Sequence, residues 1–191
     1  MDIRKSIIEK ASQLLEKYGY KKVTIDDIAR ETGVSHSTIY KYFKSKNEIV
    51  AHVARKEAEE TGRLIEEIIA KDLPGIEKLE EVLIFLVRRI LTKKNMYRIT
   101  FSDLIEIYPV IEKVIEQEEK KAKERLKKIL VQIKDEYDAS YDPDALTDSL
   151  FFVISGINNL LIIKNFNEDE VVNHFRTLFT AFKEIEKGDG R

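Results

Sequence analysis

Apolar residues recur every three to four positions through most of this chain, which is the spacing of one face of an α-helix. The first stripe consists of Ile7, Ala11, Leu14 and Leu15, and Gly19 ends it. The 191 residues include only seven Gly and three Pro, so few interruptions of the helices are expected. The pattern predicts an all-α fold of about nine helices.

Residues 24–46 predict two short helices joined by a tight turn, followed by the start of a third helix. Thr24 and Asp27 have the spacing of a capping box, so a helix should begin directly after Thr24. Gly33 can adopt the left-handed conformation that ends a helix, and Ser35 offers the N-cap of the next one.

The second of these short helices has an apolar and a polar face. Ile39 and Phe43 point toward a small core, as does Val34 before them. The outer faces carry His36, Ser37, Thr38, Lys41 and Tyr42. This is typical of a helix-turn-helix motif, whose second helix enters the DNA major groove. Residues 1–47 are therefore predicted to form a three-helix DNA-binding domain.

Residues 48–191 are predicted to form a larger helical domain. Ser45 and Glu48 form another capping-box pattern, so one long helix should run to about Asp72 and join both domains without a flexible linker. Pro74-Gly75 separates this helix from the next one.

Further breaks are expected around Pro109. Residues 92–95 are polar and predict an interruption, and a short apolar helix should follow over residues 97–107. Pro109 suits the first turn of a helix, so a long charged helix is expected to begin there.

The last two helices are unusually apolar. Residues 150–163 are apolar on nearly all faces, so this helix must be covered on both sides. A membrane span is the alternative, but the run is shorter than the roughly 20 residues that a span needs and contains Asn158 and Asn159.

Pairing both helices with their copies across a two-fold axis would cover them, which predicts a homodimer. Packing within one subunit is the alternative. The predicted interface residues are Phe152, Gly156, Leu160, Ile163, Phe175, Leu178, Phe179 and Phe182.

Composition narrows the class of protein. The chain has no Cys, which excludes disulfides, thiolate metal sites and a cysteine nucleophile. The first ten residues contain charges and no long apolar run, so no secretory signal is expected and the predicted location is cytoplasmic. The net charge is −2, yet residues 1–50 carry ten Lys or Arg against seven Asp or Glu. A weakly basic start on an acidic body fits a protein that touches DNA at one end.

No enzyme chemistry is predicted. The sequence has no paired-carboxylate, nucleophile or phosphate-binding glycine pattern on a recognisable loop. His36, His52 and His174 are far apart and lack ligand spacing, so neither a metal nor another cofactor is expected.

Aromatic and polar residues on separate helices of the larger domain suggest a site for a small molecule. Cavities between helices are common binding sites, and aromatic walls would favour a lipophilic ligand. Core packing is the alternative for the aromatic residues, and contact with solvent or a second subunit for the polar ones. The candidate ligand-binding residues are Phe85, Arg88, Arg89, Tyr97, Phe101, Tyr108, Phe151, Phe152 and Asn158.

The amino-terminal quarter of the chain resembles the DNA-binding domain of the TetR (tetracycline-repressor-like) family of bacterial regulators. The matching pieces are YGY at 18–20, TIDDIA at 24–29, GVS at 33–35, TIYKYF at 38–43 and SK at 45–46. Ser12 and Ser37 depart from the small residues that are common in the family at these positions, and Ser37 leaves the base preference open.

The resemblance implies a ligand-responsive transcriptional regulator. In its simplest form this is a repressor that binds an inverted-repeat operator in double-stranded DNA as a dimer and is released by a lipophilic effector. The implied DNA-binding residues are Thr24, Ser35, His36, Ser37, Thr38, Tyr40, Lys41, Tyr42 and Lys46. Lys21 and Lys22 are either exposed turn residues or further phosphate contacts. A DNA-binding or architectural protein without an effector is the alternative.

Overall fold

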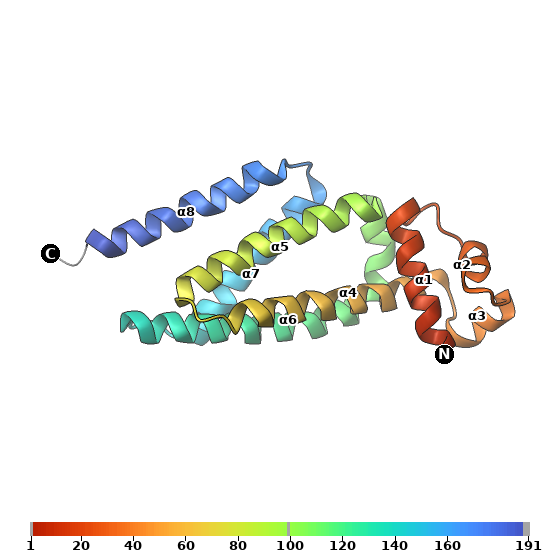
Figure 1. Cartoon of the computed structure of the whole chain (residues 1–191), viewed down its shortest axis with the longest axis horizontal. Helices are drawn as coiled ribbons and strands as arrows, with labels where there is room; N and C mark the ends of the chain where they lie inside the picture. Colours follow the sequence, from red (N-terminus) through yellow and green to blue (C-terminus); the bar gives the residue numbers. More distant parts are fainter. Residues whose placement is uncertain (1, 99, 189–191) are drawn as a thin grey trace. The chain divides into compact units, whose positions relative to one another are not determined.

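The computed structural model describes residues 2–98 and 100–188, except for the side chains at positions 101, 104 and 185–188. The described residues form eight α-helices and no strand (Figure 1). In chain order these are α1 (Ile3–Tyr18), α2 (Ile25–Thr32), α3 (His36–Tyr42), α4 (Lys46–Ile69), α5 (Gly75–Tyr97), α6 (Phe101–Tyr137), α7 (Pro143–Ile163) and α8 (Glu168–Gly188). The predicted all-α fold is confirmed, with one helix fewer than expected.

The difference in helix number arises around Pro109. The sequence predicts a helix start there, but α6 runs through Pro109 as one helix. A proline inside a helix removes one backbone N–H donor and its ring clashes with the preceding turn, which kinks a helix, but the residues on both sides of Pro109 remain helical. The predicted interruption at residues 92–95 is also wrong, because α5 continues to Tyr97. The chain turns instead at Arg98, whose φ of 49° is left-handed.

The predicted caps of the short helices are confirmed. Thr24 and Asp27 form a complete capping box at the start of α2. Gly33 ends α2 in the left-handed conformation with φ of 69°, and the Ser35 side chain accepts a hydrogen bond from the Thr38 N–H to begin α3. Asp142 likewise caps α7, with Pro143 in its first turn.

The helices divide into two compact units, which are described separately. The first unit comprises Met1–Thr61 and Lys93–Glu119, and the second comprises Gly62–Thr92 and Lys120–Arg191. The helices α4, α5 and α6 each contribute residues to both units. The domain boundary at residue 47 remains a prediction, and the first unit extends well beyond it.

The first unit has its own apolar core. Residues of α1, α2, α3 and α4 supply most of it, and the end of α5 and the start of α6 complete it. The buried members are Ile7, Ala11, Leu15, Tyr20, Val23, Ile28, Ala29, Ile39, Phe43, Ile49, Val53, Tyr97 and Ile107.

The second unit is built around α6, whose Leu126, Ile129 and Leu130 are buried. They pack in one cluster with residues of α4, α5 and α8, namely Ile65, Leu79, Val82 and Phe179. A smaller cluster joins α5 to α7 and α8 through Val87, Leu91, Leu161 and Val172.

Large apolar side chains remain exposed on α7 and α8 in this single chain. They are Phe152, Val153, Leu160, Ile163, Leu178 and Phe182, and Phe152 is 81% exposed. By contrast, Phe179 is only 3% exposed, and both Phe179 and Phe175 pack in the core of their own unit. Phe179 is therefore withdrawn from the predicted interface, because α8 turns this side chain toward α4, α5 and α6.

Among the described helices, α7 is long and apolar enough to cross a membrane by the criteria of length and composition alone. Little of its apolar surface is buried within the chain. Exposure of this kind is equally what a helix shows when it packs against a second copy of the protein.

Candidate DNA-binding head

The two short helices of the first unit present a polar surface above an apolar one. Ile28 and Ala29 of α2 and Ile39 of α3 are buried, and Phe43 closes the end of α3. The inner face is thereby fixed against α1 and α4. We call the outer residues of α3 the recognition surface; they are Ser35, His36, Ser37, Thr38, Tyr40, Lys41 and Tyr42.

Most of the recognition surface faces solvent. Among its aromatic residues, Tyr40 is 53% exposed and Tyr42 is 40% exposed. Lys41 is also exposed. Apolar bodies with hydroxyl tips and an exposed cation are groups that contact DNA backbone and base edges. The helix is short and narrow, which suits a major groove.

Hydrogen bonds within the recognition surface order its first turn. The Ser35 hydroxyl lies 2.8 Å from the Ser37 hydroxyl and 2.9 Å from that of Thr38. His36 contacts the Asp26 carboxylate at the start of α2 through Nε2 and lies edge-on to Tyr40. The starts of the two short helices are therefore tied together by side chains as well as by the turn.

The two predicted phosphate contacts at helix starts differ in their surroundings. Thr24 is exposed, but its hydroxyl and N–H both donate to the Asp27 carboxylate in the capping box. The Lys46 ammonium donates to the Tyr20 carbonyl at 2.5 Å and lies 4.2 Å from the centre of the Tyr20 ring. Burial lowers the pKa of Lys46. Lys46 thus makes contacts within the first unit, whereas Lys41 is exposed to solvent.

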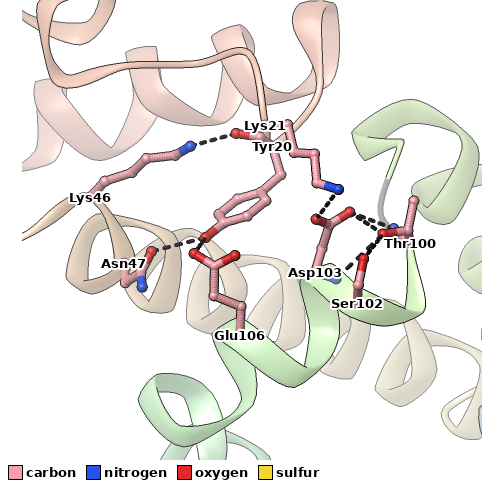
Figure 2. Close-up of polar contacts among 8 residues, drawn as sticks. All are labelled: Tyr20, Lys21, Lys46, Asn47, Thr100, Ser102, Asp103 and Glu106. Carbon is pink, nitrogen blue, oxygen red and sulfur yellow. Dashed lines mark hydrogen bonds and ion pairs between the residues drawn. The ribbon is translucent and has the colours of Figure 1, made fainter.

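The turn between α1 and α2 is bound to residues far along the chain (Figure 2). The Tyr20 hydroxyl lies 3.1 Å from both Asn47 Oδ1 and Glu106 Oε1. Burial, followed by the hydrogen bond to Glu106, raises the pKa of Tyr20 to about 12. Lys21 forms an ion pair with Asp103 of α6 at 3.2 Å. These partners are not predicted from the sequence, although Thr100 and Asp103 repeat the Thr-x-x-Asp spacing of Thr24 and Asp27.

A second polar cluster joins the end of α5 to α1 and α4. The Lys93 ammonium lies 3.2 Å from Glu16 Oε1 and 2.9 Å from Glu57 Oε2. The Tyr97 hydroxyl donates to Glu57 Oε1 at 3.1 Å, and burial raises the pKa of this phenol. Tyr97, a predicted ligand residue, is therefore a structural member of the first unit.

The other predicted ligand residues fall into different surroundings. Phe85 and Phe151 are half-buried beside the main core of the second unit. Arg88 is exposed and pairs with Glu168 at 3.6 Å, whereas Arg89 and Asn158 are half-buried. Phe152 is exposed on α7, and Tyr108 is exposed in the first unit. The Phe101 side chain lies outside the described residues.

The structure thus brings Phe85 and Phe151 into one core cluster and divides the rest of the predicted ligand set between the two units. Within the part of the chain that is described, no group of three or more His, Asp or Glu residues is arranged to hold a metal ion.

His52 supports the end of α3 from α4. Its Nε2 atom lies 2.7 Å from a guanidinium nitrogen of Arg4, and its ring lies edge-on to Phe43. Because a guanidinium only donates, Nε2 accepts, and the neutral ring carries its proton on Nδ1. Burial lowers the pKa of His52, and Arg4 and Arg55 lower it further, while Glu48 opposes them.

Residues 7–53 match the family model described as bacterial regulatory proteins of the tetR family. The uncharacterized HTH-type transcriptional regulator YvkB of Bacillus subtilis is 30% identical over 115 residues, which are 59% of this chain and 58% of that protein. The fatty acid metabolism regulator protein of Bacillus subtilis is 31% identical over 77 residues, 40% of each chain. The chain spans about half the length of the curated relatives that it matches.

Two solved structures share the fold over most of their length. A transcriptional regulator from Cytophaga hutchinsonii has a TM-score of 0.76 at 19% identity, covering 92% of this chain and 94% of that one. The regulator FadR from Bacillus subtilis in complex with stearoyl-CoA has a TM-score of 0.60 at 19% identity, covering 92% and 96%.

The fold and the capped pair of short helices define a helix-turn-helix protein of the class that includes transcriptional regulators. Residues 7–53, which contain these two helices, match the tetR family model, so the likeness to this family is carried by the amino-terminal part of the chain. Its charged, exposed recognition surface lies within the matched region.

The His52 environment predicts that acid weakens the first unit. The folded state binds a proton at His52 less readily than the unfolded state does. The free energy of unfolding should therefore decrease as the pH falls below about 6.5, the pKa of His52 in the unfolded chain, and level off below its lower pKa in the folded state. Urea unfolding at a series of pH values should show this loss, and His52→Gln should flatten the curve in that range. His174→Gln, an exposed histidine of the second unit, is the matched control and should leave the curve unchanged.

Proposed function

We propose that this protein is a transcriptional regulator that binds an inverted-repeat operator as a homodimer and releases it when a lipophilic effector binds. The observation that carries the proposal is the recognition surface, which is polar and open above a buried inner face. The match of residues 7–53 to the tetR family model supports a role in transcription. Repression by blocking polymerase is the simplest outcome.

The size of α3 supports binding to two half-sites. A helix of seven residues reaches only a few base pairs, and two copies placed about one helical turn apart, roughly 34 Å, would read an inverted repeat. His36, Ser37, Thr38 and Lys41 are the proposed contacts to bases or adjacent phosphates. Tyr40 and Tyr42 are proposed to lie against the backbone or a thymine methyl group.

Replacing the exposed residues of the recognition surface should weaken DNA binding. The operator would first be isolated by selecting bound duplexes from random DNA, where an inverted repeat is expected. Lys41→Ala or Tyr42→Ala should then raise the dissociation constant about 10- to 100-fold, because each contact contributes about 1–3 kcal/mol. Fluorescence anisotropy with a labelled operator would measure it.

Exposed residues of matched type elsewhere in the first unit serve as controls. Tyr18 is 42% exposed, close to the 40% of Tyr42, and Lys113 is exposed on α6. Tyr18→Ala and Lys113→Ala should leave operator affinity unchanged. Equal affinities for all four variants would contradict the proposed recognition surface.

The apolar faces of α7 and α8 support the proposed homodimer. Moving one large apolar side chain from full exposure to full burial contributes about 1.5–3 kcal/mol. Most of these side chains are about half exposed, so a second copy that covers all of them would still be favoured. The interface that we propose consists of Phe152, Gly156, Leu160, Ile163, Leu178 and Phe182, with Phe175 at its edge.

Gly156→Leu should weaken the dimer without disturbing the single chain. A Cβ atom built at Gly156 meets nothing within 4 Å in the described structure, so the protomer has room for the new side chain. A partner helix packed on this face would not, and overpacking costs typically about 1–3 kcal/mol, or up to about 100-fold in the dimer dissociation constant. Analytical ultracentrifugation would measure it, with Gln117→Leu on the exposed face of α6 as control. A dimer of unchanged stability would move the interface elsewhere.

Relatives support a lipophilic effector. The matched Bacillus subtilis protein is named a fatty acid metabolism regulator, and FadR of the same organism was solved with stearoyl-CoA. In this chain, Phe85 and Phe151 belong to the core cluster of the second unit, and Arg88 and Arg89 follow Phe85 within the same helix. Apolar walls beside cationic groups suit an acyl chain with an anionic head, so we propose a long-chain acyl thioester as the effector class.

Stearoyl-CoA should therefore lower the affinity of the protein for its operator. Allosteric coupling is typically about 5- to 150-fold, and the effect cannot exceed the preference of the ligand for one conformation over the other. Anisotropy titrations with stearoyl-CoA, stearate and free coenzyme A would separate the acyl chain from the nucleotide. If lipophilic compounds leave operator affinity unchanged, the protein is a DNA-binding regulator without such an effector.

A further inference from the structure

The segment that connects α1 to α2 is held closely against the corner between α5 and α6. Gly19 has φ of 84°, and a Cβ atom there would lie 3.2 Å from both the Tyr97 carbonyl oxygen and Arg98 Cβ. The Tyr20 N–H donates to that same carbonyl at 3.1 Å. Only a glycine both adopts this backbone conformation easily and permits this approach. The next residue, Lys21, is consequently brought to the first turn of α6.

Asp103 is the residue that Lys21 meets there. Its Oδ2 atom caps α6 by accepting hydrogen bonds from the Thr100 N–H at 2.8 Å and the Thr100 hydroxyl at 2.5 Å. Its Oδ1 atom is buried and has no hydrogen bond of good geometry among the described residues. Lys21 Nζ lies 3.2 Å from this atom, and Figure 2 shows the ammonium directed at it.

The two members of this ion pair differ sharply in exposure. The Asp103 side chain is 1% exposed, whereas the Lys21 side chain is 65% exposed. Asp27 performs the same capping role in α2 and remains 28% exposed, so helix capping alone does not require burial. Burial disfavours the charged carboxylate, but the hydrogen bonds from Thr100 and the Lys21 ammonium outweigh it and keep the pKa of Asp103 below its usual value.

This arrangement fixes the position of an otherwise flexible cation. If Lys21 moved away, it would leave a buried, uncompensated charge, which is strongly unfavourable. An ammonium has three N–H donors, and Asp103 faces only one side of it, so the others remain directed to solvent. Lys21 stands three residues before Thr24, the N-cap of α2, and therefore beside the helix-turn-helix motif.

We propose that Asp103 is a positioning residue for DNA binding: it holds the Lys21 ammonium beside the start of α2, where the remaining donors bind a phosphate of the DNA backbone. The inference rests on the proposed function. A lysine that is already ordered loses less side-chain entropy on binding than a free one. Because the carboxylate is buried and the ammonium exposed, the cation is the member of the pair that a phosphate reaches.

Lys22 provides a matched control in the same turn. It carries the same charge and is exposed, and no carboxylate partner is found for it among the described residues. If charge near α2 were all that mattered, Lys21 and Lys22 would respond alike to a change at Asp103. If Asp103 orients Lys21, only Lys21 responds.

The test is a double-mutant cycle on the full chain, with a 30-base-pair duplex of random sequence as the probe. A phosphate contact is independent of sequence, so this probe reports it directly. Lys21→Ala and Asp103→Asn should each weaken binding about three- to tenfold near 0.1 M salt, and the double variant should be no weaker than either single one. Lys21→Ala should also make the slope of log affinity against log salt concentration less steep, by about one for each subunit bound.

Further variants separate positioning from a general structural effect. Lys21→Arg keeps the ion pair and should bind nearly as the wild type does. Lys22→Ala and Asp103→Asn should combine additively. Asn retains an oxygen that accepts from Thr100, so α6 keeps its cap, and circular dichroism checks the fold. If Asp103→Asn does not fold, Asp103→Ser replaces it in the same cycle.

Two results would overturn the inference. One is unchanged or tighter binding by Asp103→Asn, which would mean that the carboxylate only offsets the lysine charge. The other is an additive loss in the Lys21→Ala, Asp103→Asn double variant. Failure of the proposed function looks different, because the wild type would then bind no duplex and Lys41→Ala would have no effect.

Discussion

Burial of the inner faces of α2 and α3 is the constraint on which the first unit depends. Helices of eight and seven residues are not stable alone in water, because nucleation costs more than so few hydrogen bonds return. Ile28 and Ile39 are fully buried, and Phe43 closes the core beside them. Caps at Thr24 and Ser35 then fix where each helix begins. The outer residues of α3 do not contribute to this core, so they can contact another molecule without loss of packing.

The two units expose different kinds of surface. In the first unit the open face of α3 is polar, so it remains compatible with water whether or not DNA is bound. In the second unit α7 and α8 expose large apolar side chains, which water solvates poorly. This contrast fits the proposed roles, in which contact with DNA is reversible and contact with a second copy is lasting. The helices α4, α5 and α6 each contribute residues to both units.

The local features of the fold could be predicted from the sequence, and the long-range ones could not. Thr24, Gly33 and Ser35 were identified correctly because caps and left-handed turns depend on a few neighbouring residues. By contrast, α6 continues through Pro109, although local preference predicts that a helix begins there. The side-chain directions of Tyr97 and Phe179 depend on which helix lies opposite, so an aromatic residue that suggested a ligand or an interface proved to belong to a core.

The hydrogen bonds and ion pairs of residues 93–107 with α1 and α4 affect how this DNA-binding region could be fused to the sensor domain of another regulator. A chimera made by joining a foreign sensor at residue 61 would discard Lys93, Tyr97 and Asp103, and Glu16 and Glu57 would lose their contacts with Lys93 and Tyr97. It would also remove two buried side chains, Tyr97 and Ile107, from the small core. The first unit is therefore discontinuous in sequence, and transferring it to another protein requires junctions in three helices, α4, α5 and α6.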